Sequence, residues 1–312
     1  MSFRAGDLRI SLLTACLLAA FLMAHSVPAQ QRRTTNARTT PAVLTITTEP
    51  NATVWIDDVR RGTTDGSGKL TLTKISPGRH SLRVRADGFN EVTRPLLSTG
   101  SVIVKLVKTK DPAELLFQQA EAAREKAKDE DERERAAELY RQALKLRPAF
   151  PAAHLGLARV LSSLNRYQDA LNEIDAARNT RPIYPEASAT EGRIYREAAF
   201  TQDAIKSFRR SIREGRGFQP EAHVGLALLF EEKGQYPEAI TEFRTAIQQL
   251  SDSEPVIYQL LGAAYERVQK YKEAVAAYEQ YLALAPSGTL APAIRSIIEQ
   301  LRRQSAGEEI IP

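Results

Sequence analysis

One pattern of small and large apolar positions returns five times between residues 136 and 286. An alanine anchors each copy, and successive anchors are 34 or 35 residues apart: Ala136, Ala170, Ala204, Ala239 and Ala274. A large apolar residue stands four positions after each anchor: Tyr140, Ile174, Phe208, Phe243 and Tyr278. A small residue stands twelve positions before the last four anchors: Ala158, Gly192, Ala227 and Gly262. Such a period is typical of stacked helix pairs, in which small residues let two helices approach and large ones fill the space beside them.

Turn or end signals accompany four of the five copies. Turn sequences precede three anchors: Asn165-Arg166-Tyr167, Gly234-Gln235-Tyr236 and Gln269-Lys270-Tyr271. Pro148, Pro182 and Pro286 close three copies, because proline cannot continue a helix. This pattern resembles the tetratricopeptide repeat (TPR) family over roughly residues 113–287. The resemblance implies an all-α solenoid of about five helix pairs, in which the first helix of each pair lines a concave face that binds a protein or peptide.

Some positions depart from the repeat, and the end of the chain differs from it. Arg216 and Ser251 stand where a closing proline is expected, and Tyr281 stands where a small residue is usual. An apolar stripe follows the last copy: Leu290, Ile294, Ile297, Ile298 and Leu301. We therefore predict a repeat array over 109–287, followed by a capping helix and tail over 288–312.

Apolar and polar residues alternate from residue 42 onward, which indicates strands. We predict strands at 43–47, 53–57, 69–72, 80–86 and 101–107, with a turn-rich loop over 62–68. About six short strands in this length predict a small sandwich or curled sheet. Four segments carry a resemblance to the PEGA domain, a β module of bacterial envelope proteins: 49–57, 61–64, 76–80 and 86–89. The resemblance implies an extracytoplasmic binding or spacer module without catalysis over 42–108, here termed the β module. The predicted fold class is α+β and multidomain.

The start of the chain has the features of an export signal. Arg4 and Arg9 precede an apolar run over 10–24, and a small-residue site precedes Gln30. We predict a signal peptide over 1–29 and a flexible linker over 30–41, which place the protein in the periplasm or cell envelope. Two alternatives remain, an inner-membrane anchor through 10–24 and lipidation of Cys16. Cys16 is the only cysteine, so the cleaved chain could form no disulfide.

Charge is unevenly distributed along the chain. Residues 42–110 carry 11 Lys and Arg against 6 Asp and Glu, whereas residues 111–312 carry 27 against 31. A basic β module outside the cytoplasm could contact an anionic envelope glycan or lipid head groups. We expect no nucleic-acid partner, and membrane contact only if the signal segment is retained or lipidated. We expect Arg83 and Arg85 to lie on a solvated strand face, and Trp55 to pack within its strand.

No catalytic motif or cofactor fingerprint appears, which predicts a non-enzymatic protein without a cofactor. His154 and His223 each stand sixteen positions before an anchor, so we interpret them as helix-packing residues and not as metal ligands. Positions around the small first-helix residues predict the partner-binding groove: Leu155, Arg159, Ser162, Ala189, Arg193, Arg196, Val224, Leu228, Glu231, Gln259, Ala263 and Glu266. An acidic group is expected near Arg159, Arg193 and Arg196; alternatively, these arginines are solvated and pair with Glu191 or Glu197.

Together these features predict an exported scaffold or adaptor that binds a protein or peptide through the concave face of its repeat array. In this interpretation the β module is an envelope-side binding or spacer module. The alternative is a cell-wall or surface-glycan-binding protein, in which the β module binds and the array is the spacer.

Overall fold

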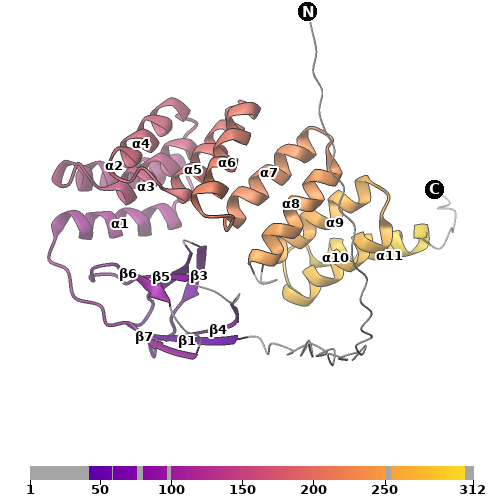
Figure 1. Ribbon diagram of the computed structural model, residues 1–312, viewed down its shortest axis with the longest axis horizontal. Helices are drawn as coiled ribbons and strands as arrows, with labels where there is room; N and C mark the ends of the chain where they lie inside the picture. Colours follow the sequence, from indigo (N-terminus) through magenta and orange to yellow (C-terminus); the bar gives the residue numbers. More distant parts are fainter. Residues whose placement is uncertain (1–41, 58, 76–79, 97–99, 251–253, 306–312) are drawn as a thin grey trace, which may run out of the picture. The chain divides into compact units, whose positions relative to one another are not determined.

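The computed structural model describes residues 42–57, 59–75, 80–96, 100–250 and 254–305. Within these ranges the chain forms seven strands followed by eleven helices (Figure 1), as the predicted α+β class requires. The predicted signal peptide, the linker, Cys16 and most of the polar tail lie outside the described residues. In the described part, no helix has both the length and the apolar character needed to cross a membrane.

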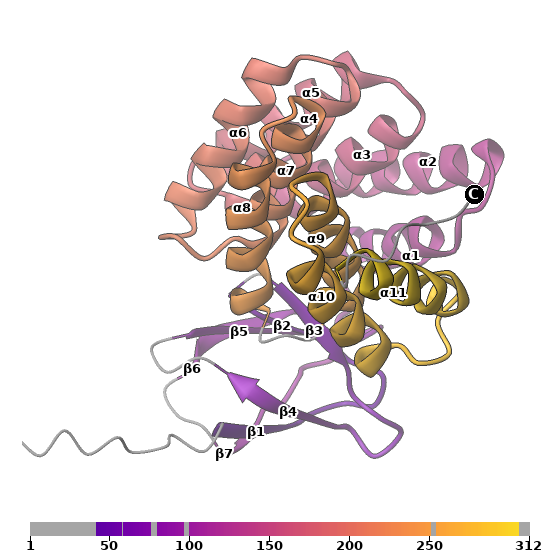
Figure 2. The ribbon, with the colours of Figure 1, turned by 90° about the vertical axis from the view of Figure 1, so that its right-hand side faces the viewer.

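The strands form two sheets, which lie one above the other in Figure 2. Their bounds are β1 (Ala42–Thr47), β2 (Thr53–Ile56), β3 (Val59–Thr63), β4 (Lys69–Ile75), β5 (His80–Arg85), β6 (Val92–Leu96) and β7 (Gly100–Ile103). One sheet has the order β4-β1-β7, with β7 parallel to β1, and the other has the order β3-β2-β5-β6. Alternating residues of both sheets, among them Leu44, Val54 and Leu82, are fully buried between them. The predicted sandwich is confirmed.

Two strands differ from the prediction. Residues 59–63 form β3, although 62–63 was assigned to a loop, and 92–96 form β6, which was not predicted. Both strands lie at the edges of their sheet. Edge strands tolerate charged residues and proline because one side of their backbone needs no hydrogen-bond partner. Arg60 and Arg61 in β3 and Pro95 in β6 therefore interrupt the alternation by which a strand is recognised in the sequence.

The helices are α1 (Pro112–Lys126), α2 (Glu130–Leu146), α3 (Pro151–Ser163), α4 (Tyr167–Thr180), α5 (Pro185–Glu197), α6 (Thr201–Glu214), α7 (Pro220–Glu232), α8 (Tyr236–Gln249), α9 (Pro255–Arg267), α10 (Tyr271–Leu284) and α11 (Ala291–Ser305). The first ten form five consecutive pairs, and a proline begins the first helix of every pair. Asp111 caps α1 by accepting a hydrogen bond from the backbone N–H of Ala113, at 2.9 Å.

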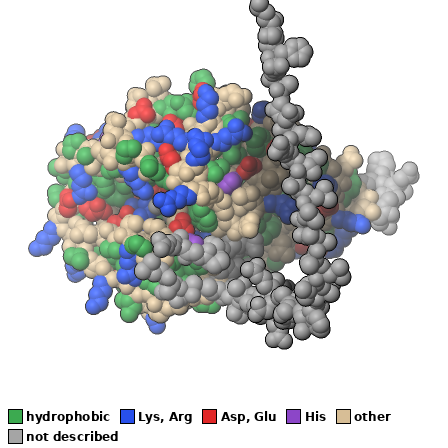
Figure 3. Space-filling view, viewed as in Figure 1, with side chains coloured by type: hydrophobic (Ala, Val, Ile, Leu, Met, Phe, Trp, Pro, Cys, Tyr) green, Lys and Arg blue, Asp and Glu red, His purple; other side chains and the backbone are tan. Residues whose placement is uncertain are grey.

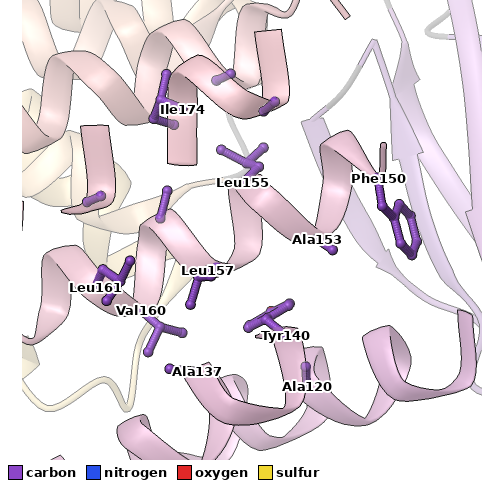
Figure 4. Close-up of a cluster of buried hydrophobic side chains, with 14 of the residues drawn as sticks. Ala120, Ala137, Tyr140, Phe150, Ala153, Leu155, Leu157, Val160, Leu161 and Ile174 are labelled. Carbon is purple, nitrogen blue, oxygen red and sulfur yellow. The ribbon is translucent and has the colours of Figure 1, made fainter. Parts of the chain in front are cut away.

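Close contact between small and large residues holds these pairs together. An added Cβ at Gly225 would lie 2.3 Å from the ring of Phe208, and one at Gly192 would lie 2.7 Å from the same ring. Tyr140 packs in the same way against Gly156 and is fully buried in the cluster that Figure 4 shows. Gly192 is one of the predicted small positions, whereas Gly156 and Gly225 lie two residues before the predicted Ala158 and Ala227. The predicted large residues Tyr140 and Phe208 therefore set the helix spacing, partly through small residues that the pattern did not include.

The last helix, α11, covers the end of the array. Ile294, Ile298 and Leu301 are buried against Tyr278 and Tyr281 of α10. Tyr281 replaces a small residue because α11 packs against it where another repeat would otherwise stack. Leu290, which we included in the apolar stripe, precedes the helix and is 45% exposed.

Candidate functional site

The first helices of the first four pairs lie next to one another, since α1 contacts α3, α3 contacts α5 and α5 contacts α7. This surface, the first-helix face, is the one on which the binding groove is predicted. At its N-terminal end, three of the predicted residues, Arg159, Ser162 and Arg193, line one cavity of about 720 Å³. The remaining lining comes from α1, α2, α3, α5, α7 and the α1–α2 turn: Arg124, Ala127, Arg133, Val160, Ser163, Glu197 and Glu221.

Four arginines and two glutamates face this arginine cavity, so its lining has an excess of positive charge. Two of these arginines make long contacts with their neighbours. Arg124 is 3.5 Å from Glu121, and Arg159 Nε is 3.4 Å from Thr190 Oγ1. The Nε atom of Arg124 is buried and has no hydrogen-bond partner among the described residues. Because the contact of Arg159 is long, its guanidinium group can form shorter bonds with an anionic group that enters the cavity.

The predicted groove arginines do not pair with Glu191 or Glu197, the alternative that the sequence left open. Arg193 pairs with Glu221 of α7 at 3.3 Å, and Arg196 lies 4.0 Å from Glu232. Arg193 and Glu221 are both partly exposed, so their attraction is screened by water and a partner can compete for the arginine.

The other predicted groove residues have different environments. Leu155 and Ala189 are buried in the array, whereas Gln259 and Ala263 are half-buried. Burial raises the pKa of Glu231, and Glu266 accepts a hydrogen bond from the hydroxyl of Tyr278. Val224 and Leu228 pack into an apolar cluster of α7, α8 and α9, and Val59 of β3 packs against the same cluster. The β module therefore packs against the same apolar cluster as these two groove residues.

A largely buried ion pair, Arg83–Glu186, joins the β module to the array. Arg83 of β5 donates to both carboxylate oxygens of Glu186 on α5, at 2.6 and 3.4 Å, and both side chains are about 10% exposed. The guanidinium carbon of Arg83 also lies 4.6 Å from the centre of the Trp55 ring. Trp55 is half-buried beneath arginines, which leaves this ring poorly placed to stack on a sugar.

Arg85, two residues further along β5, contacts α1. Its guanidinium group lies 4.6 Å from the centre of the Phe117 ring and pairs with Glu91 at 2.6 Å and Glu121 at 3.4 Å. Burial alone would raise the pKa of Glu121, but the charges of Arg124 and Arg85 outweigh it, so that this pKa lies below its usual value. The expectation that Arg83 and Arg85 form a solvated strand face is therefore wrong, because the array covers them and supplies their acidic partners.

A glutamine completes this interface. The side-chain oxygen of Gln118 on α1 accepts from the backbone N–H of Gly88 at 2.8 Å, and its nitrogen donates to the carbonyl of Phe89 at 2.9 Å. Gln118 thus satisfies two backbone groups of the β module in the way a neighbouring strand would. The sequence signal that could have indicated the interface is weak: Arg83 and Arg85 of β5 lie on the same face of the sheet as Trp55 of β2, which pairs opposite Arg83.

The two helical histidines have equivalent partners. His154 lies 2.6 Å from a carboxylate oxygen of Glu173, and His223 lies 2.6 Å from one of Glu242. Each histidine thus joins the first helix of its pair to the second, which agrees with their interpretation as packing residues. Among the described residues, no group of three or more His, Cys, Asp or Glu side chains is arranged to hold a metal ion.

Comparison with known proteins agrees with this architecture. Residues 127–194 and 218–287 match two tetratricopeptide repeat families, and residues 42–107 match the PEGA domain. No curated protein matches the sequence.

Among solved structures, PilF of Pseudomonas aeruginosa is 14% identical with a TM-score of 0.54, and the match covers 63% of this chain and 87% of that one. The APC/C hetero-tetramer Cut9–Hcn1 contains a chain that is 15% identical with a TM-score of 0.52; this match covers 62% of the present chain but only 37% of the other. At these identities the likeness concerns the fold alone. The family matches and the helix pairs show that the chain is a tetratricopeptide repeat protein with an N-terminal PEGA domain.

Proposed function

We propose that this protein is an exported, non-enzymatic scaffold that binds an acidic segment of a protein partner in the arginine cavity of its first-helix face. Tetratricopeptide repeats support a role in protein interaction. The observation that carries the finer proposal is the convergence of Arg124, Arg133, Arg159 and Arg193 on one cavity of about 720 Å³. Planar guanidinium groups bind carboxylates through two parallel hydrogen bonds, so several of them in one cavity favour an acidic ligand.

The β module has a defined place in this proposal. It packs on the first-helix face at Glu121, Glu186 and the apolar cluster of α7 to α9, and none of its described residues lines the arginine cavity. The partner therefore reaches the cavity without displacing the β module. Export rests on the predicted signal peptide over 1–29 and remains part of the proposal.

Fluorescence anisotropy tests this function. The probe is a labelled peptide with a central run of glutamates, and its matched control has glutamines in their place. The double variant Arg159→Glu/Arg193→Glu should weaken binding of the glutamate peptide by at least about tenfold. The control variant Arg302→Glu/Arg303→Glu makes the same charge change on α11 and should have little effect. Equal binding of both peptides, or equal loss in both variants, would contradict the proposal.

A further inference from the structure

A row of basic side chains on α6 takes no part in the proposed function. Lys206, Arg209, Arg210 and Arg213 are spaced so that they share one side of the helix. Lys206 pairs with Asp203 and Arg210 with Glu214, but Arg209 and Arg213 have no acidic partner in the part of the chain that the structure describes. Figure 3 shows Lys and Arg side chains gathered over the region of α5 and α6.

The basic row continues into a cavity between the array and the β module. Arg216 lies just beyond the end of α6, at a position where most repeats have a closing proline, and it lines a cavity of about 640 Å³. Arg94 of β6 and Arg181, which follows α4, line the same cavity. Its two carboxylates already have partners within the protein, because Asp57 lies 2.5 Å from His80 and Glu214 pairs with Arg178 and Arg210.

Apolar side chains lie beside these charges. Phe218, Ile183 and Pro185 line the cavity, and Ile183 is 69% exposed. A sugar ring has one apolar face that packs on aromatic and aliphatic side chains, whereas its carboxylate or phosphate substituents pair with arginine. A cavity that offers both kinds of surface fits a charged sugar better than a simple anion.

We propose that α6 and this cavity form a binding site for a linear anionic polysaccharide. Its acidic groups pair with Arg209 and Arg213 along the helix and with Arg216 in the cavity, where one sugar ring packs against Phe218. A flat lipid surface could contact the exposed helix but could not enter the recess. The site also differs from the one expected from charge alone, because Arg83 and Arg85 of the basic β module are already paired within the protein.

This proposal does not depend on the arginine cavity. Binding to the full chain is measured with polygalacturonate, a linear carboxylated polysaccharide, and with neutral dextran, inorganic polyphosphate and vesicles that contain phosphatidylglycerol. The variants are Arg209→Glu/Arg213→Glu, Arg216→Glu and Phe218→Ala. Arg302→Glu/Arg303→Glu on α11 is the control for a general change in charge. Because Phe218 is half-buried, thermal melting checks that each variant folds.

Polygalacturonate should bind, dextran should not, and raising the salt concentration should weaken binding. The α6 double variant should lose at least about tenfold in affinity, and the α11 variant should lose little. Phe218→Ala should weaken polygalacturonate but not polyphosphate. Absence of polygalacturonate binding, or equal losses in the α6 and α11 variants, would overturn the proposal. So would an equal effect of Phe218→Ala on both polymers, or a preference for the vesicles over polygalacturonate.

Discussion

Arg83 and Glu186, which are 103 positions apart in the sequence, form a two-point ion pair that joins β5 to α5. Both side chains are about 10% exposed, so the pair is largely shielded from water and its two charges compensate each other. The pair lies beside Trp55, the only tryptophan of the chain. Fluorescence of this residue therefore reports directly on the contact between the β module and the array.

Breaking this pair on one side should destabilise the protein. Arg83→Met leaves Glu186 buried without its partner, which should lower the free energy of unfolding by about 3–5 kcal/mol. The double variant Arg83→Met/Glu186→Met removes both charges and should recover most of that loss. Urea denaturation followed by Trp55 fluorescence measures both values. A single variant within about 1 kcal/mol of the wild type would show that the contact is not held by this pair.

Loss of the Gln118 side chain should loosen the same interface at a different point. Gln118→Leu leaves the N–H of Gly88 and the carbonyl of Phe89 without partners, at a cost of about 1–3 kcal/mol. Hydrogen exchange at the Gly88 amide should become faster. Gln168→Leu, at an exposed position of α4, is the matched control and should leave that exchange rate unchanged. Equal rates at Gly88 in both variants would contradict the assigned bond.

Contact between Gly225 and Phe208 should be sensitive to a single methyl group. Alanine has a helix propensity about 1 kcal/mol better than glycine, but at Gly225 its Cβ would lie 2.3 Å from the Phe208 ring. Overpacking should dominate, so Gly225→Ala should lose about 1–3 kcal/mol of stability, and Phe208→Leu in the same chain should restore part of it. Gly66→Ala is the control, since nothing lies within 4 Å of an added Cβ there. Stabilisation by Gly225→Ala would contradict the predicted spacing.

The same contact explains why the helical array could be predicted from the sequence. Anchors such as Ala204 and partners such as Phe208 recur because every helix pair packs in the same way. The same residue sizes are therefore needed at the same spacing in each repeat, and the sequence shows this as a period. The interface at Arg83 recurs nowhere. Its partner Glu186 is far away in the sequence, and an alternating Arg-Val-Arg strand looks the same whether water or another domain covers it.

The candidate sites were predictable to different degrees for the same reason. Arg159 and Arg193 could be placed on one surface because they are one period apart, and they do line one cavity. Arg124 and Arg133 were missed because the first repeat aligns poorly with the others, around the turn between α1 and α2. Nothing in the sequence indicates that Val59 packs against the cluster of α7 to α9. The charged residues of β3 prevented the strand itself from being recognised.

Stability should depend on pH through His154. Burial would lower its pKa, but hydrogen bonds to Glu173 and to the carbonyl of Pro148 outweigh burial and raise it above its usual value. A raised pKa stabilises the folded state below the unfolded pKa of about 6.5, and this contribution is lost as pH rises through the folded value. Replacing His154 with Gln should therefore cost more stability at about pH 5 than at about pH 8. Thermal melting at both values measures the difference.

A charge-removing variant is the control for this effect. Glu173→Gln keeps a hydrogen-bond acceptor near His154 but removes the carboxylate charge, so it should reduce the pH dependence without abolishing folding. An identical loss for the His154 variant at both pH values would mean that the ring acts by packing alone.

Photo-crosslinking at the arginine cavity tests the central claim most directly. A photoreactive amino acid replaces Ser163, which is exposed at the cavity, and in a second protein it replaces Asn172, which is exposed on α4. Both are irradiated in envelope extract, with and without Arg159→Glu/Arg193→Glu. We predict a protein adduct at position 163 that is absent at position 172 and disappears in the charge-reversed variant. Identical adducts at both positions, or an adduct at 163 that survives charge reversal, would contradict an arginine-dependent partner site on the first-helix face.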